Sequence, residues 1–436
     1  MNASTRDAGL IRSVGTWGLA ASVVNMVIGA SIFVVPAPLA ANVGIYAPLA
    51  IVACAIAVGA VAICFAEGGS RIPSSGGAYG YIEAAFGPMT AYSAGTLLWF
   101  GDVLACGGIA AALADVIAGL LPPAHAGITH AVVVTVTIAG VAAVNMSGVD
   151  RGMRLVKATV LAKLAPLAVF LVVGAFALHG ANFHHPAPLS GVGVGRAIIL
   201  VVFAFMGMET ALCASGEVAR PERTIPRALA LALGMVTLVY LGIQVVAQGM
   251  LGAALATSTA PLADAMARAS PMLRLLMLAG TSLSMFGYLS SDILGSPRIL
   301  FAFARDGLLP RALGRTHPRT HAPHVAIGCY ALLAILLALT GTFVELAVLS
   351  ALTTAGFYIA GCAASWRLAR GEVRGDGAPL NFRWLGTAAF VGIASMIGLI
   401  AVASHAEILG LAALIGASVV IYSLQTRWMQ WRSEPL

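Results

Sequence analysis

Twelve long apolar stretches follow one another along the chain, separated by short polar segments. They lie near residues 14–38, 45–66, 88–120, 128–147, 155–178, 196–218, 228–252, 271–301, 323–341, 344–366, 384–404 and 407–425. A helix needs roughly 20 apolar residues to cross the hydrocarbon core of a bilayer, where only helices and closed barrels satisfy every backbone polar group. The pattern therefore predicts an all-α integral membrane protein with 12 transmembrane helices.

Charged residues are too scarce for a protein that folds in water. Only 9% of the 436 residues are charged and 60% are hydrophobic, whereas soluble domains carry about 25% charged residues. The sequence also lacks the GxxxxGK[ST] pattern of nucleotide-binding loops and the HExxH pattern of metalloproteases. We therefore expect no enzyme activity, no cofactor and no metal site.

The basic residues predict how the chain sits in the membrane. With a cytoplasmic N-terminus, all but four of the 24 lysines and arginines fall in segments on the cytoplasmic side. The exceptions are Lys163, inside a span, and Arg196, Arg268 and Arg274 on the outer side. Cytoplasmic loops of membrane proteins are enriched in Lys and Arg. We therefore expect both termini in the cytoplasm and a multi-pass protein of the plasma (cell inner) membrane, with a net charge of +7 that reflects topology rather than nucleic-acid binding.

Two spans carry a glycine with small or polar neighbours at mid-membrane depth. The first contains Ile28–Phe33, closed by Pro36 and Pro38, and the sixth contains Phe203–Thr210. Paired interrupted helices mark the midplane site of many transporters, although close packing through small residues is the alternative for either glycine alone. Unwinding frees backbone N–H groups for a carboxylate and C=O groups for an ammonium, the two groups that every α-amino acid carries. The predicted substrate contacts at these breaks are Val27, Gly29, Ala30, Ser31, Ile32, Met206 and Gly207.

Five motifs in order resemble the amino acid–polyamine–organocation superfamily, over about residues 15–428. They are GASIFVVP (29–36), FAEGGSRIP (65–73), GGAYGY (76–81), GEVARPERTIP (216–226) and PRILFAFARDGLLP (297–310). The resemblance implies the leucine-transporter fold, in which spans 1–5 and 6–10 form inverted repeats and spans 11 and 12 are appended. The implied units are a cytoplasmic N-terminus at 1–13, repeats at 14–178 and 196–366, spans 11–12 at 384–425 and a cytoplasmic C-terminus at 426–436.

The same resemblance implies roles for pocket residues. The family usually has Gly-Ser-Gly at the first break, and Ser31 at the second glycine position is expected to narrow the pocket or add a hydroxyl contact. Phe203 is similar to the aromatic gate that covers the substrate from outside, with helix packing as its alternative. Ser291 stands where relatives that take long cationic substrates carry a large aromatic. Together with Met206 and Met208, it favours a neutral substrate side chain.

Four ionisable residues lie inside spans, where charge is costly and commonly functional. Lys163 resembles the lysine that replaces a coupling sodium ion between spans 1 and 8, so it is expected to stabilise a gate state and couple protons. Its alternative is snorkelling to the surface. Glu209 resembles a proton-sensing glutamate of span 6, or a carboxylate that ties unwound backbone together. Asp102 and Asp292 either face the pocket and favour a cationic substrate or pair with polar neighbours, and pairing is favoured.

The resulting functional prediction is a secondary active transporter of neutral amino acids that works by alternating access. It is expected to be sodium-independent and to run as a proton symporter or as an exchanger (antiporter). One alternative is an exporter or exchanger of cationic amino acids or polyamines, with Asp102, Glu209 or Asp292 binding the extra charge. Another is a non-transporting amino acid sensor. The expected partners are the amino acid, protons and the lipid bilayer, with no nucleic acid, in a monomer or homodimer.

Overall fold

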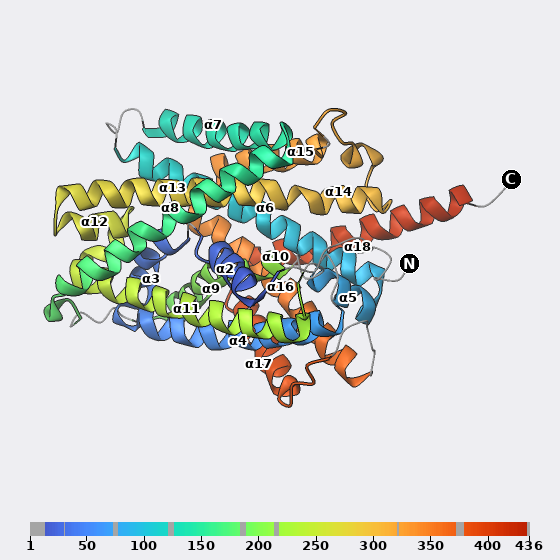
Figure 1. Cartoon of the computed structure of the whole chain (residues 1–436), viewed down its shortest axis with the longest axis horizontal. Coiled ribbons are helices and arrows are strands. Elements are labelled where there is room, and N and C mark those ends of the chain that lie inside the picture. The colour runs from blue at the N-terminus through green and yellow to red at the C-terminus, as the bar shows by residue number, and fades with distance from the viewer. Residues whose placement is uncertain are drawn as a thin grey trace.

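The computed structural model describes residues 14–29, 31–72, 77–120, 126–183, 189–212, 218–320, 322–371 and 379–433. Ala30, a predicted substrate contact, lies outside the described residues. Within the described part the architecture is all-helical, and the one β-type contact is an isolated bridge between Val14 and Val218. The long helices α11 and α13 run along the long axis of the molecule and α8 runs obliquely to it, with α12 at one end and α5 and α14 at the other (Figure 1).

The first half of the chain forms α2 (Thr16–Val27), α3 (Pro36–Val43), α4 (Ala47–Arg71), α5 (Ala78–Phe86), α6 (Pro88–Ala118), α7 (Ala126–Met146) and α8 (Val149–Phe176). The second half forms α9 (Gly191–Phe205), α10 (Met208–Leu212), α11 (Pro221–Leu251), α12 (Pro261–Ala267), α13 (Pro271–Gly295), α14 (Pro297–Arg305), α15 (His324–Thr340), α16 (Phe343–Arg370), α17 (Leu385–Ala401) and α18 (His405–Ser433). Short 3₁₀ turns join several of them, among them η1 (Ser31–Phe33) between α2 and α3 and η6 (Gly252–Thr257) before α12.

Eight helices of the described residues are long and apolar enough to cross a membrane. They cover 36–71, 88–118, 127–146, 191–210, 221–257, 271–305, 343–370 and 405–426. Four shorter apolar helices cover 16–27, 163–176, 324–340 and 385–401. Each of the twelve apolar stretches of the sequence overlaps one of these helices. Length and composition thus support eight crossings, and twelve crossings stay a prediction.

Small residues let the central helices approach closely. A methyl group on Gly101 of α6 would lie 2.8 Å from the Thr353 hydroxyl of α16, and one on Gly108 would lie 3.2 Å from Cβ of Leu346. The Ser350 hydroxyl of α16 also donates to the Gly101 carbonyl at 2.8 Å. Small residues and interhelical hydrogen bonds are the usual means of helix association in a bilayer. Here they hold α6 in close contact with α16.

Both interruptions predicted from the sequence are present. α2 ends at Val27, and the helix resumes as the 3₁₀ turn η1 at Ser31. α9 ends at Phe205 and α10 begins at Met208. Gly207, between them, has φ +119, a conformation that glycine adopts readily because it has no Cβ. The break in the second helix therefore depends on glycine at this position.

Candidate functional site

The two helix breaks lie directly against each other. A Cβ atom built on Gly207 would lie 2.9 Å from the carbonyl carbon of Met26 and 3.2 Å from the backbone nitrogen of Val27. α10 also packs against α2. The missing side chain therefore lets the backbone of the second break touch the last turn of α2. Helix ends leave unpaired backbone groups, and this contact brings two such ends together in the interior.

A narrow internal cavity of about 40 Å³ lies between the breaks, α6 and α13. Of the predicted site residues, its wall includes Val27, Gly29, Ser31, Phe203, Met206, Gly207, Asp102, Glu209 and Asp292. Two others, Ile32 and Ser291, lie outside this wall in the present conformation. The Ser291 hydroxyl instead donates to the Gly287 carbonyl of its own helix at 3.1 Å. The sequence therefore located most of the residues that surround the cavity.

Tyr240 of α11 joins the two broken helices, and sequence reasoning missed it. Its hydroxyl oxygen lies 2.7 Å from the Val27 carbonyl of α2 and 2.8 Å from the Ala204 carbonyl of α9. It is also hydrogen-bonded to the Ser31 side chain. A phenol has one proton to donate. Tyr240 therefore donates to one of the two carbonyls at a time and remains within hydrogen-bonding distance of the other. The sequence signal was a single tyrosine within an apolar stretch, which is easily overlooked.

Glu209 binds the unwound backbone of the second break. Its Oε1 accepts a hydrogen bond from the Gly207 backbone N–H at 3.0 Å, and its Oε2 accepts one from the Tyr358 hydroxyl at 2.6 Å. A carboxylate near the first turn of a helix satisfies otherwise unpaired N–H groups. The glutamate thus makes the backbone-tying contact that the sequence predicted, and Tyr358 of α16 supplies a partner that it did not.

Asp102 and Asp292 meet through Ser296. The Ser296 Oγ lies 2.7 Å from Oδ2 of Asp102 and 3.1 Å from Oδ1 of Asp292. A serine has one hydroxyl proton, so Ser296 donates fully to only one of these two side chains at a time. Asp292 already accepts from the Tyr330 hydroxyl and is hydrogen-bonded to Cys106. Ser296 therefore links the two aspartates, and Asp292 is the one that also contacts Tyr330 and Cys106.

Lys163 points into the protein. Its side chain is buried, with 5% exposure, and its Nζ donates to the Asn25 carbonyl of α2 at 2.5 Å. The carbonyls of the last turn of a helix attract a cation. Snorkelling to the surface is therefore excluded in this conformation. Among the described residues Lys163 has no hydrogen bond to α13, so the predicted bridge is present only on its α2 side.

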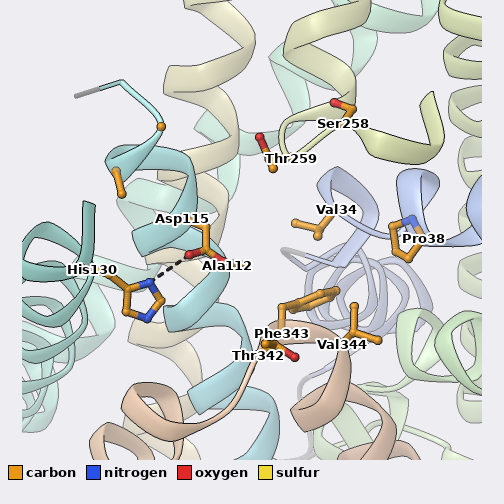
Figure 2. Close-up of a pocket in the computed structure, with 13 residues that line it drawn as sticks. Val34, Pro38, Ala112, Asp115, His130, Ser258, Thr259, Thr342, Phe343 and Val344 are labelled. Carbon is orange, nitrogen blue, oxygen red and sulfur yellow. Dashed lines mark hydrogen bonds and ion pairs between the residues drawn. The ribbon is translucent and has the colours of Figure 1, made fainter. Parts of the chain in front are cut away.

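An aromatic pair separates the cavity from a larger pocket. Phe203, on the cavity wall, contacts Phe343 of α16 edge to face, with ring centroids 5.9 Å apart. Phe343 in turn lines a pocket of about 730 Å³ between α3, α6, α7, α16 and the turn before α12. Figure 2 shows Phe343 between Thr342 and Val344 in this pocket. The arrangement suits the gating role predicted for Phe203, and Phe343 is a second member that sequence reasoning did not find.

The larger pocket has a polar wall opposite the aromatic pair. Nδ1 of His130 on α7 lies 2.9 Å from Oδ1 of Asp115 on α6, drawn as the dashed line in Figure 2. The Asp115 side chain is 57% exposed, so water screens this pair and its contribution to stability is small. We therefore assign the pair to the pocket mouth rather than to the core.

Comparison with known proteins finds a permease family and several transporters that are similar to this chain. A family model described as amino acid permease matches residues 14–405. An uncharacterized transporter of Mycobacterium tuberculosis is 35% identical over 308 residues, which are 68% of this chain and 66% of that protein. The branched-chain amino acid permease BcaP of Lactococcus lactis is 28% identical over 77% of each chain. The serine/threonine exchanger SteT of Bacillus subtilis is 27% identical over 86% of this chain and 88% of its own.

Proposed function

The chain belongs to the amino acid permease family, and from this premise we propose that it is a secondary active transporter of amino acids working by alternating access. The observation that carries the proposal is the contact between two helix breaks around one cavity, made by Gly207 against Met26 and Val27. The relatives named as a branched-chain amino acid permease and a serine/threonine exchanger support the substrate class.

The breaks offer complementary groups to an amino acid. α2 and α9 end at the cavity with carbonyl groups, which attract the substrate ammonium. η1 and α10 begin there with N–H groups, which attract the carboxylate. The Phe203–Phe343 pair covers the site toward the larger pocket, and its separation would admit the substrate from that side. Release to the other side then requires α2 and α10 to separate.

A neutral substrate side chain agrees best with the hydrogen bonds around the cavity. Both oxygens of Glu209 accept from Gly207 and Tyr358. Asp292 accepts from Tyr330, and the Ser296 hydroxyl lies between Asp292 and Asp102 as their shared donor. Each carboxyl group therefore already has donors, which reduces the acceptor capacity that is left for a cationic substrate group. This argues against the alternative of a cationic amino acid or polyamine substrate.

The apolar helices and the family membership make this a multi-pass membrane protein. We extend this to twelve spans with both termini in the cytoplasm. Repeats at 14–178 and 196–366 would be arranged as in the leucine-transporter fold, with 384–425 appended. Transport is proposed to be sodium-independent, driven by protons or by exchange. The contact of the Lys163 ammonium with the Asn25 carbonyl supports this, because a fixed cation stands beside the first break.

Flux measurements in proteoliposomes test the proposal. Vesicles preloaded with a neutral amino acid should take up labelled neutral amino acid without sodium, and unlabelled leucine, serine or threonine should compete. Lysine and putrescine should not compete. Binding of the amino acid without flux would instead identify a sensor, and saturation by lysine or putrescine alone would identify the cationic alternative.

A further inference from the structure

An apolar groove of about 760 Å³ lies on α4 between α11 and α17, away from the residues of the candidate site. Figure 1 shows α4 and α11 side by side with α17 next to α4. Small residues of α4 form its floor, and larger side chains such as Leu233 of α11 and Trp384 before α17 form its walls. At Gly59 an added Cβ would find no atom within 4 Å, so the groove reaches the α4 backbone.

The length of the groove matches one leaflet of a bilayer. Its floor runs along α4 from Ile56 to Ala66, which is about 15 Å at ~1.5 Å per residue. Half of a hydrocarbon core of roughly 30 Å is about the same length. A single acyl chain of one leaflet would therefore fill the groove along α4 from Ile56 to Ala66.

The end of the groove near Arg71 is held by a buried polar network. Oε2 of Glu67 accepts from the Phe382 backbone N–H at 3.1 Å, and the Ser70 hydroxyl accepts from the Leu380 N–H at 3.2 Å. Arg71 donates to Glu67 at 2.8 Å and to the Asn381 side chain at 2.9 Å. Glu67 and Ser70 are fully buried. The segment before α17 is thus fixed on α4, and the groove wall it forms is preorganised.

Positive charge gathers at this same end. Exposed Arg383 stands between the lining residues Phe382 and Trp384, with its guanidinium carbon 5.5 Å from the Trp384 ring centroid. Exposed Arg227 follows the lining residue Pro226. α11 begins nearby at Pro221, and its N-terminal end also favours anions. Glu222 in the first turn of α11 offsets part of this charge, and the balance at the groove end remains positive.

We propose that this groove binds an anionic glycerophospholipid. One acyl chain lies on the floor between α4, α11 and α17, and the phosphate lies at Arg383 and Arg227. Basic pockets between transmembrane helices on the cytoplasmic side recognise anionic headgroups, and tryptophan is enriched at the membrane interface. The site goes beyond the proposed transport function. It rests on that proposal only for the assignment of the groove end to the cytoplasmic leaflet.

Native mass spectrometry of the purified full-length protein tests the site without requiring transport. The protein is incubated in detergent with phosphatidylglycerol or phosphatidylcholine of identical acyl chains, and retained lipid is counted. We expect one phosphatidylglycerol retained in preference to phosphatidylcholine. Arg383→Gln and Arg227→Gln should each lower this preference about five-fold. The matched control is Arg315→Gln, which alters another exposed arginine and should change nothing.

Filling the groove tests its location. Gly59→Leu and, from the opposite wall, Ala230→Leu should each abolish retention of the lipid. Gly140→Leu on α7 is the control, because it also adds a side chain into open space. Size-exclusion chromatography shows which variants fold. If Gly59→Leu does not fold, Ala230→Leu tests the groove instead. Equal retention of the two lipids, or retention in Gly59→Leu and Ala230→Leu equal to that in Gly140→Leu, would overturn the proposal.

Discussion

The Tyr240 hydroxyl lies 2.7 Å from the carbonyl oxygen of Val27, the last residue of α2. The same hydroxyl lies 2.8 Å from the Ala204 carbonyl near the end of α9. One side chain of α11 therefore connects the ends of both broken helices. A movement that separates them must exchange these hydrogen bonds, so Tyr240 couples the two breaks to α11.

Tyr240→Phe removes this connection with little change in shape. We expect the free energy of unfolding to fall by about 1–3 kcal/mol, because buried carbonyls lose their donor. The transport KM should rise more than kcat falls, because the Val27 and Ala204 carbonyls that lose their donor lie at the proposed substrate site. Thermal melting and initial uptake rates check this. Tyr46→Phe, at a partly exposed tyrosine, is the control. Equal kinetics in both variants would contradict the role.

Asp102→Asn and Asp292→Asn should behave differently. An asparagine at 102 can still accept from the Ser296 hydroxyl through its amide oxygen. An asparagine at 292 would turn an amide N–H toward the Ser296 or Tyr330 hydroxyl that donates to it now. We therefore expect Asp292→Asn to destabilise the protein by about 1–3 kcal/mol more than Asp102→Asn, measured by denaturation in detergent. Equal losses, or the reverse order, would contradict the larger hydrogen-bonding role of Asp292.

Phe343→Ala should open the path between the pocket and the cavity. The edge-to-face contact with Phe203 contributes about 0.5–1.5 kcal/mol, so the population in which the two rings are in contact should fall about two- to ten-fold. The check is the rate at which Ser31→Cys reacts with a membrane-impermeant thiol reagent, which should rise by a similar factor. Phe390→Ala, at a 73% exposed phenylalanine of α17, should leave the rate unchanged. A rise in both variants would mean general loosening.

Lys163→Gln should slow transport and flatten its pH dependence. The neutral amide cannot replace a charge-assisted hydrogen bond to Asn25, and bonds to charged groups contribute about 1.5–3 kcal/mol. Uptake should therefore fall by about ten-fold or more and should vary less with pH, because a glutamine amide does not ionise. Lys157→Gln, at the other lysine of the chain, is the control. Unchanged uptake and pH profile in Lys163→Gln would remove the residue from the coupling mechanism.

The sequence predicted the breaks because their chemistry is local. A helix break can be recognised from a glycine with small neighbours that is followed within ten residues by prolines, as at Gly29 and Pro36. Intramembrane charges were conspicuous for the same reason, and Lys163, Glu209, Asp102 and Asp292 all proved to be buried or to line the cavity.

The partners of those residues could not be read in the same way. Tyr240 meets Val27 across 213 positions, and Ser296 meets Asp102 across 194. Tyrosine and serine are common residues, and only the packing of α11 and α13 brings these two to the site. Phe343 likewise contacts Phe203 only because α16 begins beside α9. These partners depend on how the helices pack together, which a local sequence pattern does not predict.

The most direct measurement is sodium-free uptake of a labelled neutral amino acid by proteoliposomes that contain Gly207→Ala or Gly234→Ala. At Gly207 the added methyl group meets the Met26 backbone at 2.9 Å and strains a φ of +119, whereas at Gly234 it enters open space. Backbone strain of this kind costs about 1–3 kcal/mol. The prediction is flux in the wild type and Gly234→Ala, and flux reduced about ten-fold or more in folded Gly207→Ala. Wild-type flux in Gly207→Ala would contradict a substrate site at the two breaks.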